Sequence, residues 1–224
     1  MAATAPCEPG PTGHNGTDAS ARTGRTGDKT MGKLFDNLYL VLAIGLGLAI
    51  VLMAAIHGDR LNGDQQSMEA LLRWLHVFFG ITWIGLLYYF NFVQIPVMPT
   101  VPAELKPGVS KYIAPKALFY FRWAALFTVL TGATLAWVNG YIGDALMLRS
   151  NVRLIGIGMW LALIMAANVW FVIWPNQQRV LGLVEADDAS KAQSARTALV
   201  ASRTNVLLSI PMLYAMTTYQ TLGS

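Results

Sequence analysis

The chain has 224 residues, of which 54% are hydrophobic and only 12% charged, whereas an ordinary soluble domain carries about 25% charged residues. This composition excludes a soluble globular fold. A net charge of +4 would suggest nucleic acid in a soluble protein, but the basic residues lie between apolar segments and therefore indicate membrane topology. The single cysteine, Cys7, excludes an internal disulfide and a cysteine metal site.

The first 33 residues are rich in Gly, Ala, Thr and Pro and contain no apolar run. We therefore expect residues 1–33 to be a disordered cytoplasmic tail without a secretory signal. Translation starts at Met1 or at Met31, and the sequence leaves both open.

Five segments without charged residues follow, each between 21 and 30 residues long: 37–58, 74–103, 123–143, 154–178 and 204–224. Each is long enough to cross a bilayer once and too short to cross it twice. Because backbone groups in lipid must be satisfied internally, helices are the physical solution. The sequence predicts an all-α integral membrane bundle of five transmembrane helices in one domain, 34–224, with helices at about 37–57, 69–96, 117–139, 153–175 and 203–220.

Basic residues are distributed unequally between the two sides of this bundle. The segment before the first helix, the second loop and the fourth loop together hold 12 Lys and Arg residues, and the first and third loops hold 4. The positive-inside rule then predicts a cytoplasmic N-terminus and a periplasmic C-terminus. Within the fourth loop, Val180, Leu183 and Val184 recur at helical spacing, which favours a cytoplasmic helical extension.

Two histidines lie near the outer side of the predicted bundle. His57 ends the first helix and His76 lies in the first part of the second, with Arg60 and Arg73 beside them. Two facing imidazoles are suitable axial ligands for a haem b iron, and basic residues suit its propionates. In the alternative, His76 only hydrogen-bonds a neighbouring helix and His57 is an interfacial residue.

A larger polar group gathers at the cytoplasmic ends of four helices. It comprises Asn91, Gln94, Arg122, Asn168, Asn176, Gln177, Arg203 and Asn205. Amides pair with ring edges and Arg donates charge-assisted hydrogen bonds, so this group predicts a pocket for an anionic heteroaromatic ligand or a quinone. In the alternative, the amides tie helices together and the arginines extend to lipid phosphates. Trp170 and Trp174 are assigned to an aromatic belt without chemistry.

Four strings resemble the membrane domain of the bacterial cytochrome-c-linked urate oxidases, in the same chain order. They are Arg73-Trp-Leu-His76 continuing to Gly85, Pro115-Lys-Ala-Leu-Phe-Tyr-Phe-Arg-Trp-Ala, Met165-Ala-Ala-Asn168 continuing through Pro175-Asn176-Gln177, and Ser202-Arg203-Thr-Asn205 continuing to Pro211. The resemblance covers about 68–219. It implies an inner-membrane purine oxidase that hydroxylates urate and passes electrons to a c-type cytochrome.

The chain departs from this family in two respects. It has no Cys-x-x-Cys-His motif, which excludes a covalently attached haem c in these residues, and Thr204 stands where the family suggests a histidine. The resemblance therefore implies oxidation of urate or a similar purine, with electrons passed to a separate cytochrome c or quinone. The alternative is a non-catalytic membrane subunit or a component that binds or transports purine anions, as a homo-oligomer or within a membrane complex.

Overall fold

The computed structural model describes residues 35–58 and 63–222, which are helical with short connections and contain no strand. The tail at 1–33, with Cys7 and Met31, lies outside the described residues, as does Arg60. By the contacts within the chain, it divides into two compact units, residues 1–61 and 62–224.

The first unit contributes one long helix, α2 (Leu38–His57). Asn37 caps it, because its side-chain oxygen accepts hydrogen bonds from the backbone N–H groups of Tyr39 at 3.0 Å and Leu40 at 3.3 Å. None of its 20 residues is buried. An apolar helix without a buried face is typical of one that faces lipid.

The second unit consists of four long helical rods and short connections. The first rod is α3 (Gln65–Tyr88), a π-helical segment (Tyr89–Gln94) and α4 (Ile95–Val97). The second is α5 (Lys106–Gly108), a π-helical segment (Val109–Ile113) and α6 (Ala114–Val138). The third is α8 (Arg153–Asn168), a π-helical segment (Val169–Ile173) and α9 (Trp174–Val180), preceded by α7 (Ile142–Leu146). The fourth is α10 (Asp188–Leu222).

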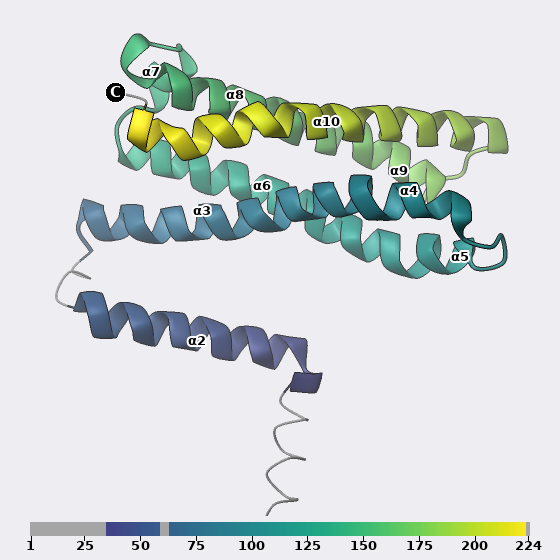
Figure 1. The fold of residues 1–224 in the computed structure, drawn as a ribbon, viewed down its shortest axis with the longest axis horizontal. Helices are drawn as coiled ribbons and strands as arrows, with labels where there is room; N and C mark the ends of the chain where they lie inside the picture. Colours follow the sequence, from purple (N-terminus) through teal and green to yellow (C-terminus); the bar gives the residue numbers. More distant parts are fainter. Residues whose placement is uncertain (1–34, 59–62, 223–224) are drawn as a thin grey trace, which may run out of the picture. The chain divides into compact units, whose positions relative to one another are not determined.

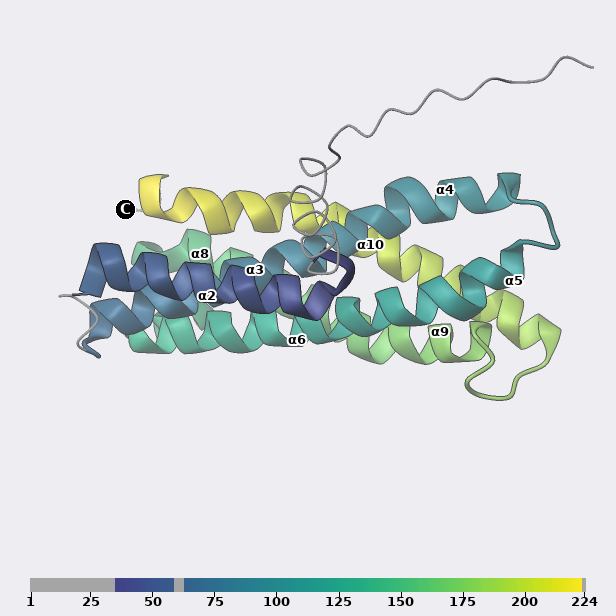
Figure 2. The same ribbon diagram turned by 90° about the horizontal axis from the view of Figure 1, so that it is seen from below.

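These rods pack as two pairs that share one core. In Figures 1 and 2, α3 lies along α6 and α8 lies along α10, and the pairs meet through α6 with α8 and α10 with α3. Large apolar side chains fill the centre, with Trp83 and Leu87 fully buried and Phe121 only 2% exposed. This burial fixes which face of each helix points inward.

Five helices of the described chain are long and apolar enough to cross a membrane, as the charge-free segments predicted. The four rods of the second unit extend over 36, 33, 31 and 34 residues, or about 50 Å at 1.5 Å per residue. A bilayer's hydrocarbon core is only about 30 Å thick. The rods are therefore longer than the hydrocarbon core by about 20 Å. One end of the unit carries α5 and the start of α10, and these segments hold the basic residues Lys106, Lys191 and Arg196.

The fourth rod begins well before the predicted range of 203–220. Helix α10 starts at Asp188, so the fourth loop does hold a helical extension. The spacing of Val180, Leu183 and Val184 placed it wrongly, because Val180 ends α9 and residues 181–187 form a turn between the two helices. The charge-free criterion missed these residues because it detects lipid-compatible sequence, whereas a helix continues into water wherever its propensity and packing allow.

Candidate functional site

His76 points from α3 toward α6. Its Nδ1 lies 2.9 Å from the backbone carbonyl oxygen of Thr128, and because a carbonyl only accepts, Nδ1 carries the proton and Nε2 keeps its lone pair. The imidazole rests on Gly132, where an added Cβ would lie 2.7 Å from His76 Cε1. A histidine oriented through Nδ1 in this way is typical of a metal ligand and also of an interhelical hydrogen bond.

The two histidines of the predicted haem site fall in different units of the chain. His76 is the only histidine of residues 62–224, while His57, the last residue of α2, is exposed and belongs to the other unit. Within the ranges 35–58 and 63–222 no group of three His, Cys, Asp or Glu side chains gathers. The second unit by itself therefore provides half of the predicted ligand pair.

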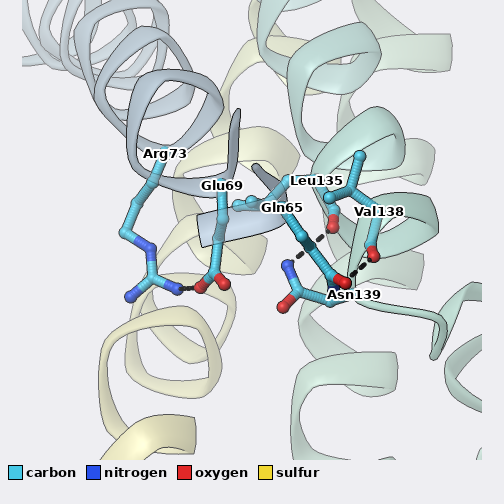
Figure 3. A network of polar contacts seen from close by, with 6 residues as sticks. All are labelled: Gln65, Glu69, Arg73, Leu135, Val138 and Asn139. Carbon is cyan, nitrogen blue, oxygen red and sulfur yellow. Dashed lines mark hydrogen bonds and ion pairs between the residues drawn. The ribbon is translucent and has the colours of Figure 1, made fainter. Parts of the chain in front are cut away.

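Arg73, expected beside the histidines, is engaged by a carboxylate. Figure 3 shows its ion pair with Glu69, one helical turn earlier on α3. In the same view, Gln65 Nε2 donates to the Val138 carbonyl oxygen at 3.0 Å and Asn139 Nδ2 donates to the Leu135 carbonyl oxygen at 2.9 Å. The Gln65 bond holds the start of α3 against the end of α6, and the Asn139 bond satisfies a carbonyl of the last turn of α6 itself.

A tyrosine pair lies at the same end of the unit. The rings of Tyr141 and Tyr219 are 6.1 Å apart between centroids. Burial raises the pKa of Tyr141, and the neighbouring Tyr219 raises it further. The hydroxyl of Tyr141 therefore stays protonated near neutral pH.

Asn168 and Asn205 join α8 to α10. Asn168 Nδ2 donates to the Ala201 carbonyl oxygen at 2.8 Å and to Asn205 Oδ1 at 2.8 Å. Asn205, which is 0% exposed, donates in turn to the Met165 carbonyl oxygen at 3.1 Å. Both protons of the Asn168 amide thus form hydrogen bonds to the neighbouring helix. This favours the alternative in which these two amides join helices rather than bind a ligand.

Asn91 connects α10 to the first rod in a similar way. Its Nδ2 donates to Ser202 Oγ at 2.8 Å and to the Leu87 carbonyl oxygen at 2.9 Å. Farther along the same helices, the hydroxyl groups of Tyr88 and Ser209 are 2.9 Å apart. Asn91 Oδ1 and Gln94 Oε1 are buried without a partner among the described residues, so the π-helical segment Tyr89–Gln94 holds two free acceptors.

Arg122 lies against two tryptophans of the third rod. Its guanidinium carbon is 3.6 Å from the centroid of the Trp174 ring and 5.2 Å from that of Trp170. The nitrogens Nε and Nη1 of Arg122 and Nε1 of Trp170 are buried and have no hydrogen-bond partner in the described chain. Three unpaired donors therefore gather at the contact between α6 and the third rod.

The remaining predicted site residues lie apart from this contact. Asn176 Nδ2 donates to the Val172 carbonyl oxygen at 2.8 Å, and its side chain lines a polar cavity of about 490 Å³ with Arg179, Glu185, Asp187 and Ser194. Gln177 is half-buried on α9. Arg203 is exposed on α10, on a different face from the buried Ser202 and Asn205, which favours the alternative that it extends outward.

Sequence reasoning missed the tryptophans of this site. Trp170 and Trp174 are four residues apart, which places them on one helix face. Both lie in the string from Met165 to Gln177, one of the four that carry the resemblance. A second missed signal is local geometry, because Asn168 and Trp174 flank a π-helical segment and Asn91 lies in another. Such segments occur frequently at functional sites.

The third rod and most of α10 match a known protein family. Residues 147–220, 74 of the 224, match the family described as urate oxidase N-terminal. The match covers α8, α9 and most of α10 and includes Asn168, Trp170, Trp174 and Asn205, and it supports a relation of this part of the chain to that family. The strings around His76 and Arg122 lie outside it. None of the curated proteins and none of the solved structures compared matches the chain.

Proposed function

We propose that the protein is a multi-pass protein of the bacterial inner membrane that oxidises urate or a similar purine and passes the electrons to a separate cytochrome c or quinone. The observation that carries this proposal is the family match over 147–220. The five membrane-capable helices are compatible with the proposed location.

The Arg122 contact supports a purine as the substrate. Urate is a planar monoanion near neutral pH, and it combines a delocalised ring with oxygens that accept hydrogen bonds. Trp170 and Trp174 offer aromatic faces, and Arg122 offers a positive charge with unpaired donors. Stacking and charge-assisted hydrogen bonds together suit such a ligand.

A haem b stays part of the proposal, and His76 is the residue that would hold its iron, through Nε2. When bound, the haem would supply one-electron transfer. The chain's own contribution is the hydrogen bond from Nδ1 to the Thr128 carbonyl oxygen, which fixes the ring and its tautomer. A second protein ligand is not assigned, because His76 is the only histidine of residues 62–224.

The proposed reaction balances with water as the oxygen source. Hydroxylation of urate by water releases two protons and two electrons, which reduce one quinone or two molecules of cytochrome c. The test is to mix the purified full-length protein with urate and either acceptor, and to follow urate absorbance and acceptor reduction together. We expect both to change in that ratio, and urate consumption without acceptor reduction in either mixture would contradict the proposal.

A non-catalytic role is the second candidate: a membrane subunit, or a component that binds or transports purine anions. The observation that favours it is that the side-chain amides of Asn91, Asn168 and Asn205 donate hydrogen bonds to neighbouring helices. Those N–H groups are therefore not available to a ligand. Saturable urate binding to the purified protein, with no reduction of either acceptor, would support this role over oxidation.

A further inference from the structure

Arg122 carries a charge that no acidic side chain of the described chain compensates. The three ion pairs found within 35–58 and 63–222 join Arg73 to Glu69, Arg149 to Asp144 and Lys191 to Asp188. Arg122 is absent from them and lies in the middle of the run Lys106–Val138. Arg122 is half-buried, and its Nε and Nη1 atoms are buried. A guanidinium remains charged under all physiological conditions, so these two atoms need hydrogen-bond acceptors.

The two tryptophans hold the guanidinium without neutralising it. Trp174 covers its face at 3.6 Å, and Trp170 approaches at 5.2 Å. A cation over an aromatic face is attracted to the ring quadrupole, but the ring accepts no conventional hydrogen bond from the guanidinium edge. Stacking therefore fixes the plane of Arg122 and leaves its N–H groups to be satisfied by something else.

The unsatisfied atoms at this place are all donors. Arg122 Nε and Nη1 and Trp170 Nε1 are buried without a hydrogen-bond partner among the residues that the structure describes. Buried polar groups in native proteins are nearly always paired, so such orphans indicate a missing partner. Because three donors and one positive charge coincide, the missing partner is an acceptor that carries negative charge.

We infer that Arg122, held by Trp170 and Trp174, is the binding site for an oxyanion. An oxyanion offers several acceptor oxygens to the guanidinium N–H groups, and its charge neutralises theirs. The ligand chemistry is shared by a soluble anion, such as urate or phosphate, and by the phosphate of a lipid headgroup. If the bound anion is urate, this inference rests on the proposed function and deepens it. It then names Arg122 as the residue that recognises the charge of the substrate.

The test measures binding without turnover, in the purified full-length protein in an uncharged detergent or in lipid vesicles. The probes are urate, inorganic phosphate, and phosphatidylcholine vesicles with and without phosphatidylglycerol. Tryptophan fluorescence reports the site, because two of its three residues are tryptophans. We expect at least one anionic probe to bind the wild-type protein, and Arg122→Gln to weaken that binding by about tenfold or more, as for a lost hydrogen bond to a charged group.

The matched control is Arg196→Gln, which removes the same charge from an exposed residue of α10 that makes no ion pair with another described residue. Its affinities should equal those of the wild-type protein. Loss of urate or phosphate binding in Arg122→Gln identifies a soluble anion. Loss of the phosphatidylglycerol effect with no binding of the soluble anions identifies a headgroup.

Two results would overturn the inference: no anionic probe binds the wild-type protein, or Arg122→Gln binds every probe as tightly as the wild type does. If Arg122→Gln fails to fold, Arg122→Lys retains the charge without the guanidinium and Trp174→Leu retains the guanidinium without the stacking face. Both should weaken binding, and unchanged affinity in both folded variants rejects the site. Urate binding that depends on Arg122, in a protein that reduces no acceptor, would keep this inference and reject the oxidase.

Discussion

Gly132 is the residue on which the His76 imidazole rests. An added Cβ at Gly132 would lie 2.7 Å from His76 Cε1 and 2.9 Å from Nδ1, closer than real Cβ contacts. We expect Gly132→Ala to push the ring away from the Thr128 carbonyl oxygen and to destabilise the protein by about 1–3 kcal/mol, the usual cost of overpacking.

Thermal unfolding of the detergent-solubilised protein checks this expectation. The control is Gly80→Ala on α3, where the nearest neighbour of the added Cβ is Thr128 Cγ2 at an ordinary 3.9 Å. That variant should be neutral or up to about 1 kcal/mol more stable, because alanine is the better helix former. Equal melting temperatures for the two variants would show that His76 is not confined by Gly132.

Asn168 and Asn205 should behave as one energetic unit. Replacing Asn168 with Leu removes two hydrogen bonds to α10 and leaves Asn205 Oδ1 without its donor. Interhelical hydrogen bonds in membrane proteins contribute about 0.6 kcal/mol on average and up to about 1.7. We expect Asn168→Leu and Asn205→Leu each to destabilise the protein, and the double variant to lose less than the sum.

A double-mutant cycle of unfolding free energies measures this coupling. A coupling energy near zero would mean that the two amides act independently. Anion binding at Arg122 should be unaffected in the folded variants, which separates a helix tie from a ligand contact.

At the scale of single residues, the sequence identifies eight polar side chains that are unusual in apolar helices. It does not say which face of a helix packs inward. Arg203 shows the difference, because each residue turns an α-helix by about 100° and its neighbour Ser202 is buried while Arg203 is exposed. The cation–aromatic contact of Arg122 joins separate helices and required the structure.

Among the elements, α10 begins next to a titratable carboxylate, that of Asp187. Asp187 Oδ1 accepts a hydrogen bond of 2.6 Å from the Ser190 backbone N–H. This bond lowers the pKa of Asp187 below its ordinary value. A carboxyl whose folded pKa is lowered adds stability above its unfolded pKa, and this stability disappears as the pH falls through the folded pKa.

We therefore expect the first turn of α10 to fray on acidification, with faster hydrogen exchange at the Ser190 amide. Asp187→Ser keeps an oxygen acceptor at the helix start but does not titrate. Its Ser190 exchange, corrected for the intrinsic pH dependence, should stay constant over the acid range in which the wild-type amide loses protection. The same acid response in both proteins would assign the fraying to another group.

The sequence predicts the extent of a helix only within its apolar, charge-free part. Each charge-free segment corresponds to a helix, because about 20 apolar residues in succession leave few alternatives. The π-helical segments Tyr89–Gln94 and Val169–Ile173 have no such signature. They depend on how neighbouring helices accommodate an extra residue, which is information from packing rather than from composition.

At the scale of the whole molecule, orientation is still a sequence-based prediction and has a direct test. The basic ends of the long rods should lie in the cytoplasm, since Lys and Arg are retained there. Alkaline phosphatase, which is active only outside the cytoplasm, should be active when fused after Ser224. It should be inactive when fused between Pro102 and Pro115, and the reverse pattern would invert the topology.

The polar ties of the second unit have a consequence for biosynthesis. Asn91, Asn168 and Tyr88 all find their interhelical partners on α10, the last of these helices to leave the ribosome. Until α10 arrives, the amides of the earlier helices have no partner of their own chain, and unpaired amides in lipid are costly. Completion of α10 would therefore act as a checkpoint: chains arrested before Ser202 should be recognised by membrane proteases and degraded faster than chains that extend past Ser209.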